Sequence, residues 1–493
     1  MGEATYLWQA FERVAALQPS APALLLEERD VTFAELEVLA LRGAALLQAR
    51  GLAKGDVVAL QRSKEIETYA LMLGALRLGA IYVCLDPNNP AARTERMLER
   101  VRPRIMFCEG ETANPFGDLI ASSHPAWRAQ AWPDPMLRRD PRLQLVGADP
   151  AYIMFTSGST GEPKGAAIPQ RGVLMLMRWA RELFADLDQP RFSALNPLHF
   201  DNSVFDFYCG LASGAALAPV ETGRSDDPAR WIDALRRARA NVVFAVPTLF
   251  LLLDRMGLLT PEALPDVRYF VFGGEGFPIR KLAAFRNRFA GAARLINVYG
   301  PTETSCICSS IEVTDESVRE AGSGFHSLGK MHADFLHAVL DADGSPTPTG
   351  ETGELWIGGP AVSLGYYGDP EQTAPRFRQD PRQDRHRSIF YRTGDLVRED
   401  ENGALWFVGR ADNQVKIAGH RIELEEIDFA VQAAAGVTRA ACVAVCADAA
   451  TELVAAFQAE RAISADELRA VVRARLPAYM RPSRFVQLRE MPT

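Results

Sequence analysis

The feature that most constrains the fold is a regular alternation between residues 55 and 300, where short apolar runs rich in β-branched residues are separated by amphipathic segments. The runs lie at residues 57–60, 81–84, 105–108, 152–155, 241–246, 269–272 and 295–298. The amphipathic segments include residues 90–101, 228–239 and 278–289, and each opens with proline, which is favoured in the first turn of a helix. This alternation predicts an α/β fold in which helices cover parallel strands and ligands bind at the carboxyl ends of those strands.

The pattern changes after about residue 335, where strand-like runs at 335–340, 353–357 and 405–408 are separated by Gly, Pro and Asp. This predicts a β-rich subdomain at about residues 325–411, which completes a large N-terminal domain spanning residues 1–411. The polar segment 111–141 within that domain is predicted to be an irregular surface excursion.

Residues 412–493 are expected to form a small α+β C-terminal domain. A helix is predicted at 421–434 and strands at 440–445 and 453–458. A second helix is predicted to open at the capping box Ser464-x-x-Glu467.

Composition excludes several classes of partner. The 54 basic and 62 acidic residues give a net charge of −8, which argues against a broad nucleic-acid surface. The N-terminus lacks a basic segment followed by an apolar one, and the most apolar stretch, 242–253, is interrupted by Pro247. The seven cysteines are scattered through apolar segments without zinc-site spacing, as in reduced cytoplasmic proteins. We therefore expect a cytoplasmic protein without a secretory signal, a membrane span or a nucleic-acid partner.

A phosphate-binding loop is predicted directly after the run at 152–155. Its sequence from Thr156 to Gly165 is Thr-Ser-Gly-Ser-Thr-Gly-Glu-Pro-Lys-Gly. Glycines expose backbone N–H groups, hydroxyls donate to phosphate oxygens, and Lys164 adds a positive charge. The loop differs from the Walker pattern, because Gly165 stands where that pattern has Ser or Thr. The alternative interpretation is a flexible surface turn.

Further motifs follow in order along the chain: Phe-Asp-Asn-Ser at 200–203, Asn-Val-Tyr-Gly-Pro-Thr-Glu at 297–303, Gly-Glu-Leu at 353–355, Tyr-Arg-Thr-Gly-Asp-Leu at 391–396, Gly-Arg-Ala-Asp-Asn-Gln-Val-Lys at 409–416 and Gly-His-Arg-Ile-Glu-Leu-Glu-Glu-Ile at 419–427. With the phosphate loop, they make nearly the whole chain resemble the adenylate-forming superfamily of acyl-CoA synthetases, luciferases and nonribosomal peptide adenylation domains. The resemblance implies two half-reactions, with ATP and Mg²⁺ as cofactors. A carboxylate is first joined to AMP with release of pyrophosphate, and the acyl group then passes to a thiol.

The resemblance also implies roles for single residues. Thr156, Lys164 and Glu303 are the predicted catalytic residues, and Glu303 is the predicted Mg²⁺ ligand, since a carboxylate is the hard oxygen ligand that this ion prefers. Tyr299 is expected to stack on adenine, Asp395 to accept the ribose hydroxyls and Arg410 to contact the ribose. The other predicted nucleotide-binding residues are Ser157, Gly158, Ser159, Thr160, Asn297, Val298, Gly300, Pro301, Thr302 and Phe407.

Two expectations concern the small domain. Asp412 resembles the hinge about which the small domain rotates between the half-reactions. Family members also use a lysine in a tract like Pro-x-Thr-x-Asn-Gly-Lys, and the chain ends at Thr493, about five residues before that lysine by alignment with the family. The sequence therefore predicts a C-terminal domain truncated before its catalytic lysine, which would bind substrates but adenylate poorly.

Asp201 indicates the substrate class. In amino-acid-activating relatives an aspartate here pairs with the substrate α-ammonium, which cannot be buried cheaply without a partner. The alternative role is an N-terminal cap on the following helix. The resemblance places the side-chain pocket at Asn202, Phe205, Phe244, Val271, Gly273, Val298, Cys306 and Ile307. Its phenylalanines and valines fill much of the volume, so a small amino acid is favoured, although the apolar members could equally be ordinary core.

Residues 272–278, 362–370 and 419–427 look most similar to the stand-alone D-alanine–carrier protein ligases, which implies a phosphopantetheinylated carrier protein as partner. Gly273 replaces the cysteine of that branch, so alanine, glycine, serine and other compact amino acids of either configuration all stay open. Two other functions stay open: an acyl-CoA synthetase that activates a small carboxylic acid, and a binding protein that has lost turnover.

Overall fold

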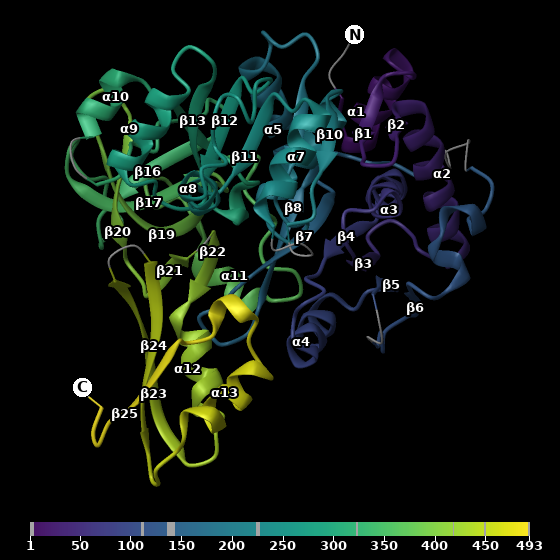
Figure 1. The fold of residues 1–493 in the computed structure, drawn as a ribbon. Helices are drawn as coiled ribbons and strands as arrows, with labels where there is room; N and C mark the ends of the chain where they lie inside the picture. Colours follow the sequence, from purple (N-terminus) through teal and green to yellow (C-terminus); the bar gives the residue numbers. More distant parts are fainter. Residues whose placement is uncertain are drawn as a thin grey trace.

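The computed structural model describes residues 4–109, 113–135, 143–222, 227–321, 324–417, 419–447 and 450–491. Figure 1 shows a large body that contains two mostly parallel sheets and a β-rich layer, with a small domain at the C-terminal end hanging below it. The predicted α/β class, with a large N-terminal and a small C-terminal domain, is confirmed.

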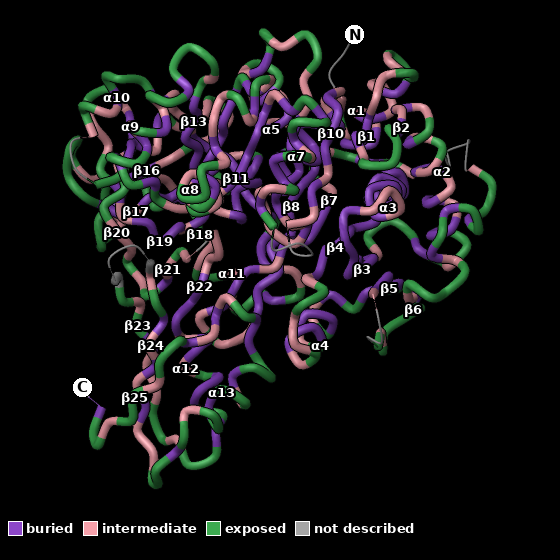
Figure 2. The backbone as a smooth tube through the Cα atoms, viewed as in Figure 1, coloured by how far each residue is buried: buried purple, intermediate pink, exposed green. Residues whose placement is uncertain are grey.

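The first sheet has the strand order β6-β5-β3-β4-β7-β8. Its strands are β3 (Val57–Gln61), β4 (Ile81–Cys84), β5 (Ile105–Cys108), β6 (Asp118–Ala121), β7 (Pro150–Thr156) and β8 (Lys164–Pro169). They pair in parallel except for β7 and β8. The helices that alternate with these strands are α2 (Phe33–Ala49), α3 (Ile66–Leu78) and α4 (Ala91–Val101). Buried parallel strands are expected to be continuously apolar, and β3, β4 and β5 are buried at every position (Figure 2).

The second sheet has the order β15-β14-β13-β12-β11-β9-β10-β1-β2. Its strands are β1 (Pro22–Leu25), β2 (Asp30–Thr32), β9 (Arg191–Ala194), β10 (Ala216–Pro219), β11 (Val242–Ala245), β12 (Tyr269–Gly273), β13 (Arg294–Tyr299), β14 (Ser309–Glu312) and β15 (Lys330–Met331). The helices along this part of the chain are α1 (Leu7–Leu17), α5 (Gln170–Leu183), α7 (Pro228–Ala238), α8 (Pro247–Arg255), α9 (Ile279–Arg288) and α10 (Asp315–Ala321). A short helix α6 (Asn202–Val204) continues into a π-helical turn at Phe205–Gly210.

The β-rich layer is an antiparallel sheet of β16 (Leu336–Leu340), β17 (Thr352–Gly358), β18 (Phe377–Gln379), β19 (Ile389–Glu399) and β20 (Leu405–Arg410), with the helix α11 (Pro370–Arg376). The small domain begins with the hairpin of β21 (Gln414–Ile417) and β22 (His420–Glu423). It continues with α12 (Leu424–Gln432), β23 (Val437–Ala447), β24 (Ala450–Ala459), α13 (Ala465–Arg473) and β25 (Arg484–Gln487). The predicted capping box of Ser464 and Glu467 is present at α13.

Two predictions are wrong. The helix expected at 421–434 begins only at Leu424, because Arg421, Ile422 and Glu423 pair with β21 instead. The segment 111–141 is not merely a surface excursion: β6 extends the first sheet, and Trp127 and Trp132 are buried in the core. Residues 111–112 and 136–141 of that segment lie outside the described residues.

Candidate nucleotide and substrate site

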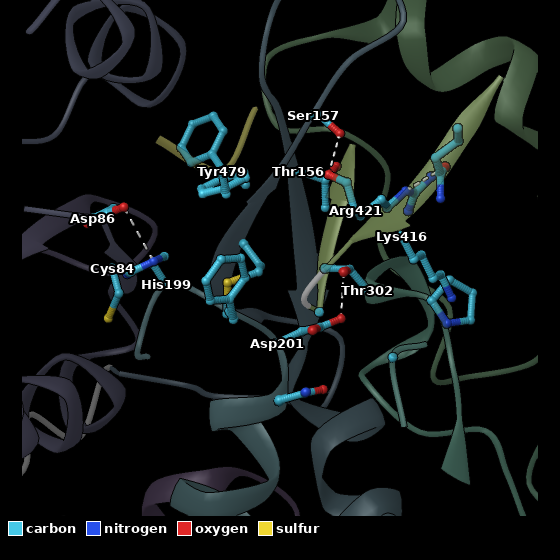
Figure 3. A pocket seen from close by; sticks show the side chains of 18 of the residues that line it. Cys84, Asp86, Thr156, Ser157, His199, Asp201, Thr302, Lys416, Arg421 and Tyr479 are labelled. Carbon is cyan, nitrogen blue, oxygen red and sulfur yellow. Dashed lines mark hydrogen bonds and ion pairs between the residues drawn. The ribbon is translucent and has the colours of Figure 1, made fainter. Parts of the chain in front are cut away.

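A pocket lies where the carboxyl ends of β7, β13 and β20 meet the hairpin β21–β22. Many of the residues that line it were predicted from the sequence: Thr156, Ser157, Asp201, Asn202, Gly300, Pro301, Thr302, Asp395 and Arg410. Figure 3 shows Lys416 and Arg421 on one side of this pocket, Asp86 and His199 on the other, and Asp201 with Thr302 between them. Predicted residues that are separated in the sequence by as many as 254 positions, from Thr156 to Arg410, therefore meet in one cavity.

The phosphate loop is shaped to hold an anion. Thr156 ends β7, and its hydroxyl is buried without a hydrogen-bond partner among the described residues. A side chain at Gly158 would overlap the carbonyl oxygen of Glu162, so only glycine allows the loop to close this tightly. The Thr160 hydroxyl accepts a hydrogen bond from the Gln372 side chain at 2.9 Å. A buried, unpartnered hydroxyl at the end of a strand is suited to a phosphate oxygen.

Lys164 and Glu303 are both held by charged residues of the hairpin. The Arg421 guanidinium lies 2.7 Å from Oε2 of Glu303, and Nζ of Lys164 lies 3.5 Å from Oε1 of Glu423. Burial by itself would raise the pKa of Glu303, but Arg421, Lys164 and the Tyr366 hydroxyl outweigh it and hold the pKa at about 2. Burial and the nearby Arg421 lower the pKa of Lys164. Glu303 therefore remains an anion at physiological pH.

Ser157 is also engaged by the hairpin. Its hydroxyl donates to the carbonyl of Arg421 at 2.7 Å and accepts from the backbone N–H of Glu423 at 3.1 Å. Together with the pairs of Lys164 and Glu303, these bonds place Arg421–Glu423 directly over the predicted phosphate and metal site.

The residues present fit a magnesium ion in chemistry. The two oxygens of Glu303 are bonded to the Tyr366 hydroxyl at 2.8 Å and to Arg421, so an ion would replace Arg421 at Oε2. Over the described ranges, no group of three or more His, Cys, Asp or Glu side chains could hold a metal. The site is thus suited to an ion bound mainly by phosphate oxygens and water, with one carboxylate from the protein.

Tyr299, Asp395 and Arg410 form a connected group. The Tyr299 hydroxyl donates to Oδ2 of Asp395 at 2.5 Å, and Arg410 donates to Oδ1 at 2.6 Å. Burial would raise the pKa of Asp395, but Lys416, Arg410 and the Tyr299 hydroxyl together lower it. Each carboxylate oxygen can accept more than one hydrogen bond, so Asp395 keeps capacity for sugar hydroxyls.

Other predicted nucleotide residues have different surroundings. The Asn297 side chain donates to the carbonyl of Ser327 at 2.7 Å, Val298 belongs to the main hydrophobic core, and Phe407 lies outside the pocket lining and is 37% exposed. Asn297 and Val298 are thus placed as structural supports of β13 in this arrangement.

Asp201 lies in the pocket and does not cap α6. Its side chain makes no capping hydrogen bond, so that alternative is wrong; Oδ2 instead accepts from the Thr302 hydroxyl at 2.5 Å. Burial raises the pKa of Asp201, while Thr302, Lys416 and Arg421 act in the opposite direction. The positive charges near Asp201 do not fully compensate for the burial of its carboxylate, which favours a cationic group as its ligand.

The predicted side-chain pocket is filled. Phe205, Phe244, Val271, Val298, Cys306 and Ile307 all belong to one buried core cluster. The rings of Phe205 and Phe244 meet edge to face, with centroids 4.9 Å apart. A side chain at Gly273 would collide with the carbonyl of Val298. Asn202 alone of the predicted lining residues faces the pocket described above.

Several pocket residues were not predicted. They are Asp86, Asn89, Arg93, His199 and Phe200 from the large domain and Gln414, Lys416, Gly419, Arg421 and Tyr479 from the small domain. Phe200, Gln414, Lys416, Gly419 and Arg421 stand within motifs that the sequence displays, so their presence in these motifs was the available signal. Asp86, Asn89, Arg93, His199 and Tyr479 lie outside those motifs and became visible only in three dimensions.

Two further findings concern the helices and the cysteines of the described residues. None of the helices in the described ranges is both long and apolar enough to span a membrane. The cysteines whose side chains are described are buried and free of disulfides.

Comparison with known proteins places these observations in a family. The profile described as AMP-binding enzyme matches residues 11–367. Surfactin synthase subunit 3 of Bacillus subtilis is 33% identical over 485 residues, which are 98% of this chain and 37% of that protein. An L-proline–[L-prolyl-carrier protein] ligase of Pseudomonas fluorescens is 32% identical over 481 residues, covering 94% of this chain and 92% of the ligase.

The chain thus spans little more than a third of the surfactin synthase subunit but nearly all of the proline ligase. Among solved structures, the fused adenylation–PCP di-domain protein NpsA-ThdA of Klebsiella oxytoca has a TM-score of 0.85 at 26% identity, covering 98% of this chain and 94% of that one. The matched profile, the relatives and the buried phosphate loop agree, and the chain belongs to the AMP-binding enzyme family.

Proposed function

We propose that the protein activates a small amino acid as its aminoacyl adenylate, using ATP and Mg²⁺, and transfers the aminoacyl group to the phosphopantetheine thiol of a carrier protein. The observation that carries the substrate class is Asp201, a half-buried carboxylate that lines the same pocket as the phosphate loop. An α-ammonium supplies the counter-charge that Asp201 lacks, whereas a fatty or aryl acid leaves it unpaired.

The first half-reaction requires positioning and charge neutralisation more than covalent help from the protein. The substrate carboxylate, oriented by the pairing of its ammonium with Asp201, attacks the α-phosphate in line. Thr156, Ser157 and the backbone of the loop donate to the departing pyrophosphate, and Lys164 neutralises part of its charge. Glu303 would hold Mg²⁺, which would supply further charge neutralisation on the phosphates. Asp395 and Arg410 fix the ribose, and Tyr299 supports Asp395.

The second half-reaction fits the arrangement observed here. Ser157, Lys164 and Glu303 are bonded to Arg421–Glu423, so the hairpin must withdraw before these residues can hold Mg²⁺ and phosphates. We assign the observed arrangement to the stage after pyrophosphate has left. Asp412, which accepts hydrogen bonds from Arg410 at 2.8 Å and from Arg376 at 3.2 Å, is the proposed hinge, since it lies between β20 of the large domain and β21 of the small one.

A compact substrate is supported by the packing around the site. The residues proposed to line the side-chain pocket touch one another and leave Asn202 as the one that faces the cavity. A carrier protein is supported by the relatives, one of which is an L-proline–carrier protein ligase, and by the structural neighbour, which is fused to a PCP domain.

Amino-acid-dependent exchange of pyrophosphate into ATP tests the proposal. We expect exchange with one or a few compact amino acids from a panel of D- and L-forms, and none with their deaminated analogues. Exchange with fatty or aryl acids in preference to amino acids would instead indicate an acyl-CoA synthetase. Absence of ATP binding by calorimetry would indicate a binding protein without turnover.

A further inference from the structure

One end of the pocket contains residues for which the proposed function has no use. This access arm is lined by Asp86, Asn89, Arg93 and Met97 near α4, by His199, and by Tyr479 of the small domain. The arm is continuous with the part of the pocket that contains Asp201, because all these residues line a single cavity. A thiol that attacks an aminoacyl adenylate beside Asp201 has to enter through a part of the cavity that neither the nucleotide nor the amino acid fills.

His199 lies along this route, two positions before Asp201 in the same tight turn. Its side chain is 20% exposed, and Nε2 lies 3.7 Å from Oδ2 of Asp86. Figure 3 shows this pair at one wall of the cavity. The Phe200 ring packs against the imidazole with centroids 4.6 Å apart. At 3.7 Å the contact with Asp86 is electrostatic and too long for a hydrogen bond, and the ring makes no hydrogen bond to another described residue. The neutral imidazole therefore keeps one ring nitrogen as a free proton acceptor.

We propose that His199 is the base that accepts the thiol proton in the thioester-forming step and that Asp86 is a positioning residue for its imidazole. The inference rests on the proposed function, because it assigns a residue to the second half-reaction. The pattern of an imidazole that is oriented by a carboxylate and faces a nucleophile is the general arrangement of base-activated nucleophiles.

The step balances without any further reactant. The thiol S–H bond breaks and its proton passes to His199, while the sulfur forms a bond to the acyl carbonyl carbon. The bond between that carbon and the phosphate oxygen then breaks, and AMP leaves with the electron pair. The products are the thioester, AMP and a protonated imidazole that returns its proton to water.

Burial, more than the neighbouring charges, keeps His199 in the neutral form that a base requires. Titratable groups reach it from three places: Asp86 after β4, Lys64 after β3 and His420 on β22. Burial lowers the pKa of His199, Asp86 opposes this effect, and Lys64 adds to it. The imidazole is therefore neutral at pH 7 and can take up a proton.

His420, the other imidazole near the arm, is less suited to this role. Its ring stacks flat on Tyr479, with centroids 3.6 Å apart and planes inclined by 10°. Burial lowers the pKa of His420 to about 4. Its Nδ1 is buried and has no hydrogen-bond partner among the described residues. The ring is held between packed surfaces, whereas His199 is paired with a carboxylate.

The size of the expected effect follows from the thiol. A thiol with a pKa near 8.5 is only about 3% ionised at pH 7, so a base can contribute at most about 30-fold there. At pH 9.5 the same thiol is about 90% ionised, and the benefit of a base falls to nearly nothing. A catalytic His199 is thus distinguished from a structural one by the pH dependence of the defect.

The experiment uses the full chain and free pantetheine as the acceptor thiol. Enzyme carrying preformed aminoacyl-AMP is mixed with pantetheine, and thioester formation is followed at pH 7 and pH 9.5. We expect His199→Asn to form the adenylate within about twofold of wild type, to lose about 10- to 30-fold in transfer at pH 7, and to regain nearly all of it at pH 9.5. Asp86→Asn should show a smaller loss with the same recovery.

The matched control is His337→Asn, which removes an imidazole paired with Glu399 at 3.2 Å in the β-rich sheet, outside the pocket. It should leave transfer unchanged at both pH values. Normal adenylate formation with a transfer defect of equal size at both pH values, or with no defect, overturns the assignment of His199 alone. Failure of the wild-type chain to form any aminoacyl adenylate overturns the proposed function, and this inference with it.

Discussion

Replacement of Asp201 by asparagine tests the electrostatic basis of substrate choice. The substitution keeps the shape of the side chain and an oxygen that can still accept from the Thr302 hydroxyl, which lies 2.5 Å from Oδ2. It removes only the negative charge. Because Asp201 is half-buried in the pocket and burial raises the pKa of its carboxylate, its pairing with a substrate ammonium that fills the pocket would be largely shielded from water.

The magnitude follows from that burial. Removing one partner of a buried, hydrogen-bonded charge pair costs about 2–5 kcal/mol, which corresponds to a loss of about 30- to 4,000-fold in kcat/KM for the amino acid. The deaminated analogue should lose nothing, and it should gain where the unpaired carboxylate had opposed its binding. The ratio of the two substrates therefore falls by at least as much as the activity toward the amino acid.

The assay is pyrophosphate exchange with an amino acid and its deaminated analogue side by side, with thermal unfolding as a check on folding. Asp206→Asn is the matched control. Asp206 is buried, lies five positions later, and is bonded to Asn196 at 3.0 Å without lining the pocket. The reasoning is refuted if Asp201→Asn keeps the wild-type preference for the amino acid, or if Asp206→Asn lowers that preference equally.

Three further substitutions test other parts of the site. Tyr299→Phe removes a hydrogen bond to the Asp395 carboxylate, worth about 1.5–3 kcal/mol, and should weaken ATP binding by at least about tenfold in calorimetry. Gly158→Ala places a methyl group against the carbonyl oxygen of Glu162, which forces the phosphate loop open, and should reduce ATP binding by a similar factor. The control Gly409→Ala, which has open space around its added methyl group, should leave ATP binding unchanged. Arg421→Gln leaves Glu303 buried without its partner, at a cost of about 3–5 kcal/mol to the observed arrangement. The variant should therefore slow thioester transfer while its pyrophosphate exchange stays within about threefold of wild type. Equal losses in both half-reactions would contradict this prediction.

The parts of the fold that could be predicted are those in which local pattern and tertiary burial agree. The runs at 81–84 and 105–108 are strands with those same limits, since both lie in a buried parallel sheet where every side chain is apolar. The capping box at Ser464 was predictable because it is made within four residues.

The hairpin shows where local pattern fails. Residues 421–434 contain helix-forming charged and apolar residues, yet Arg421, Ile422 and Glu423 form a strand because they pair with Gln414, Val415 and Lys416. Strand propensity depends on such cross-strand neighbours more than on the residues themselves. A short strand fused directly to the helix α12 leaves no turn signal between them, so the boundary was shifted by three positions.

The site was predictable residue by residue but not in its pairings. Thr156, Asp201, Asp395 and Arg410 were expected from the motifs and do meet in one pocket. The partners of Lys164 and Glu303 were not expected. Glu423 lies 259 positions after Lys164, and Arg421 lies 118 positions after Glu303. These pairs form only in a particular arrangement of the two domains, which the sequence pattern does not reveal. Asp86 and His199 likewise lie in segments that follow β4 and β9, which belong to different sheets.

The hydrogen bonds of the hairpin join the ribose site to the metal site. Arg410, which holds Asp395, donates to Oε1 of Gln414 at 2.9 Å, and Arg421 donates to the same oxygen at 2.8 Å while also holding Glu303. Gln414 therefore bridges two arginines that each neutralise a carboxylate of the large domain. Since charge-assisted hydrogen bonds of this kind are strong when buried, withdrawal of the hairpin would separate Arg421 from Glu303, whereas Arg410 lies on β20 of the large domain and stays beside Asp395. Under the proposed function, movement of the small domain would therefore free the proposed metal ligand Glu303, while the pair of Arg410 and Asp395 at the proposed ribose site is retained.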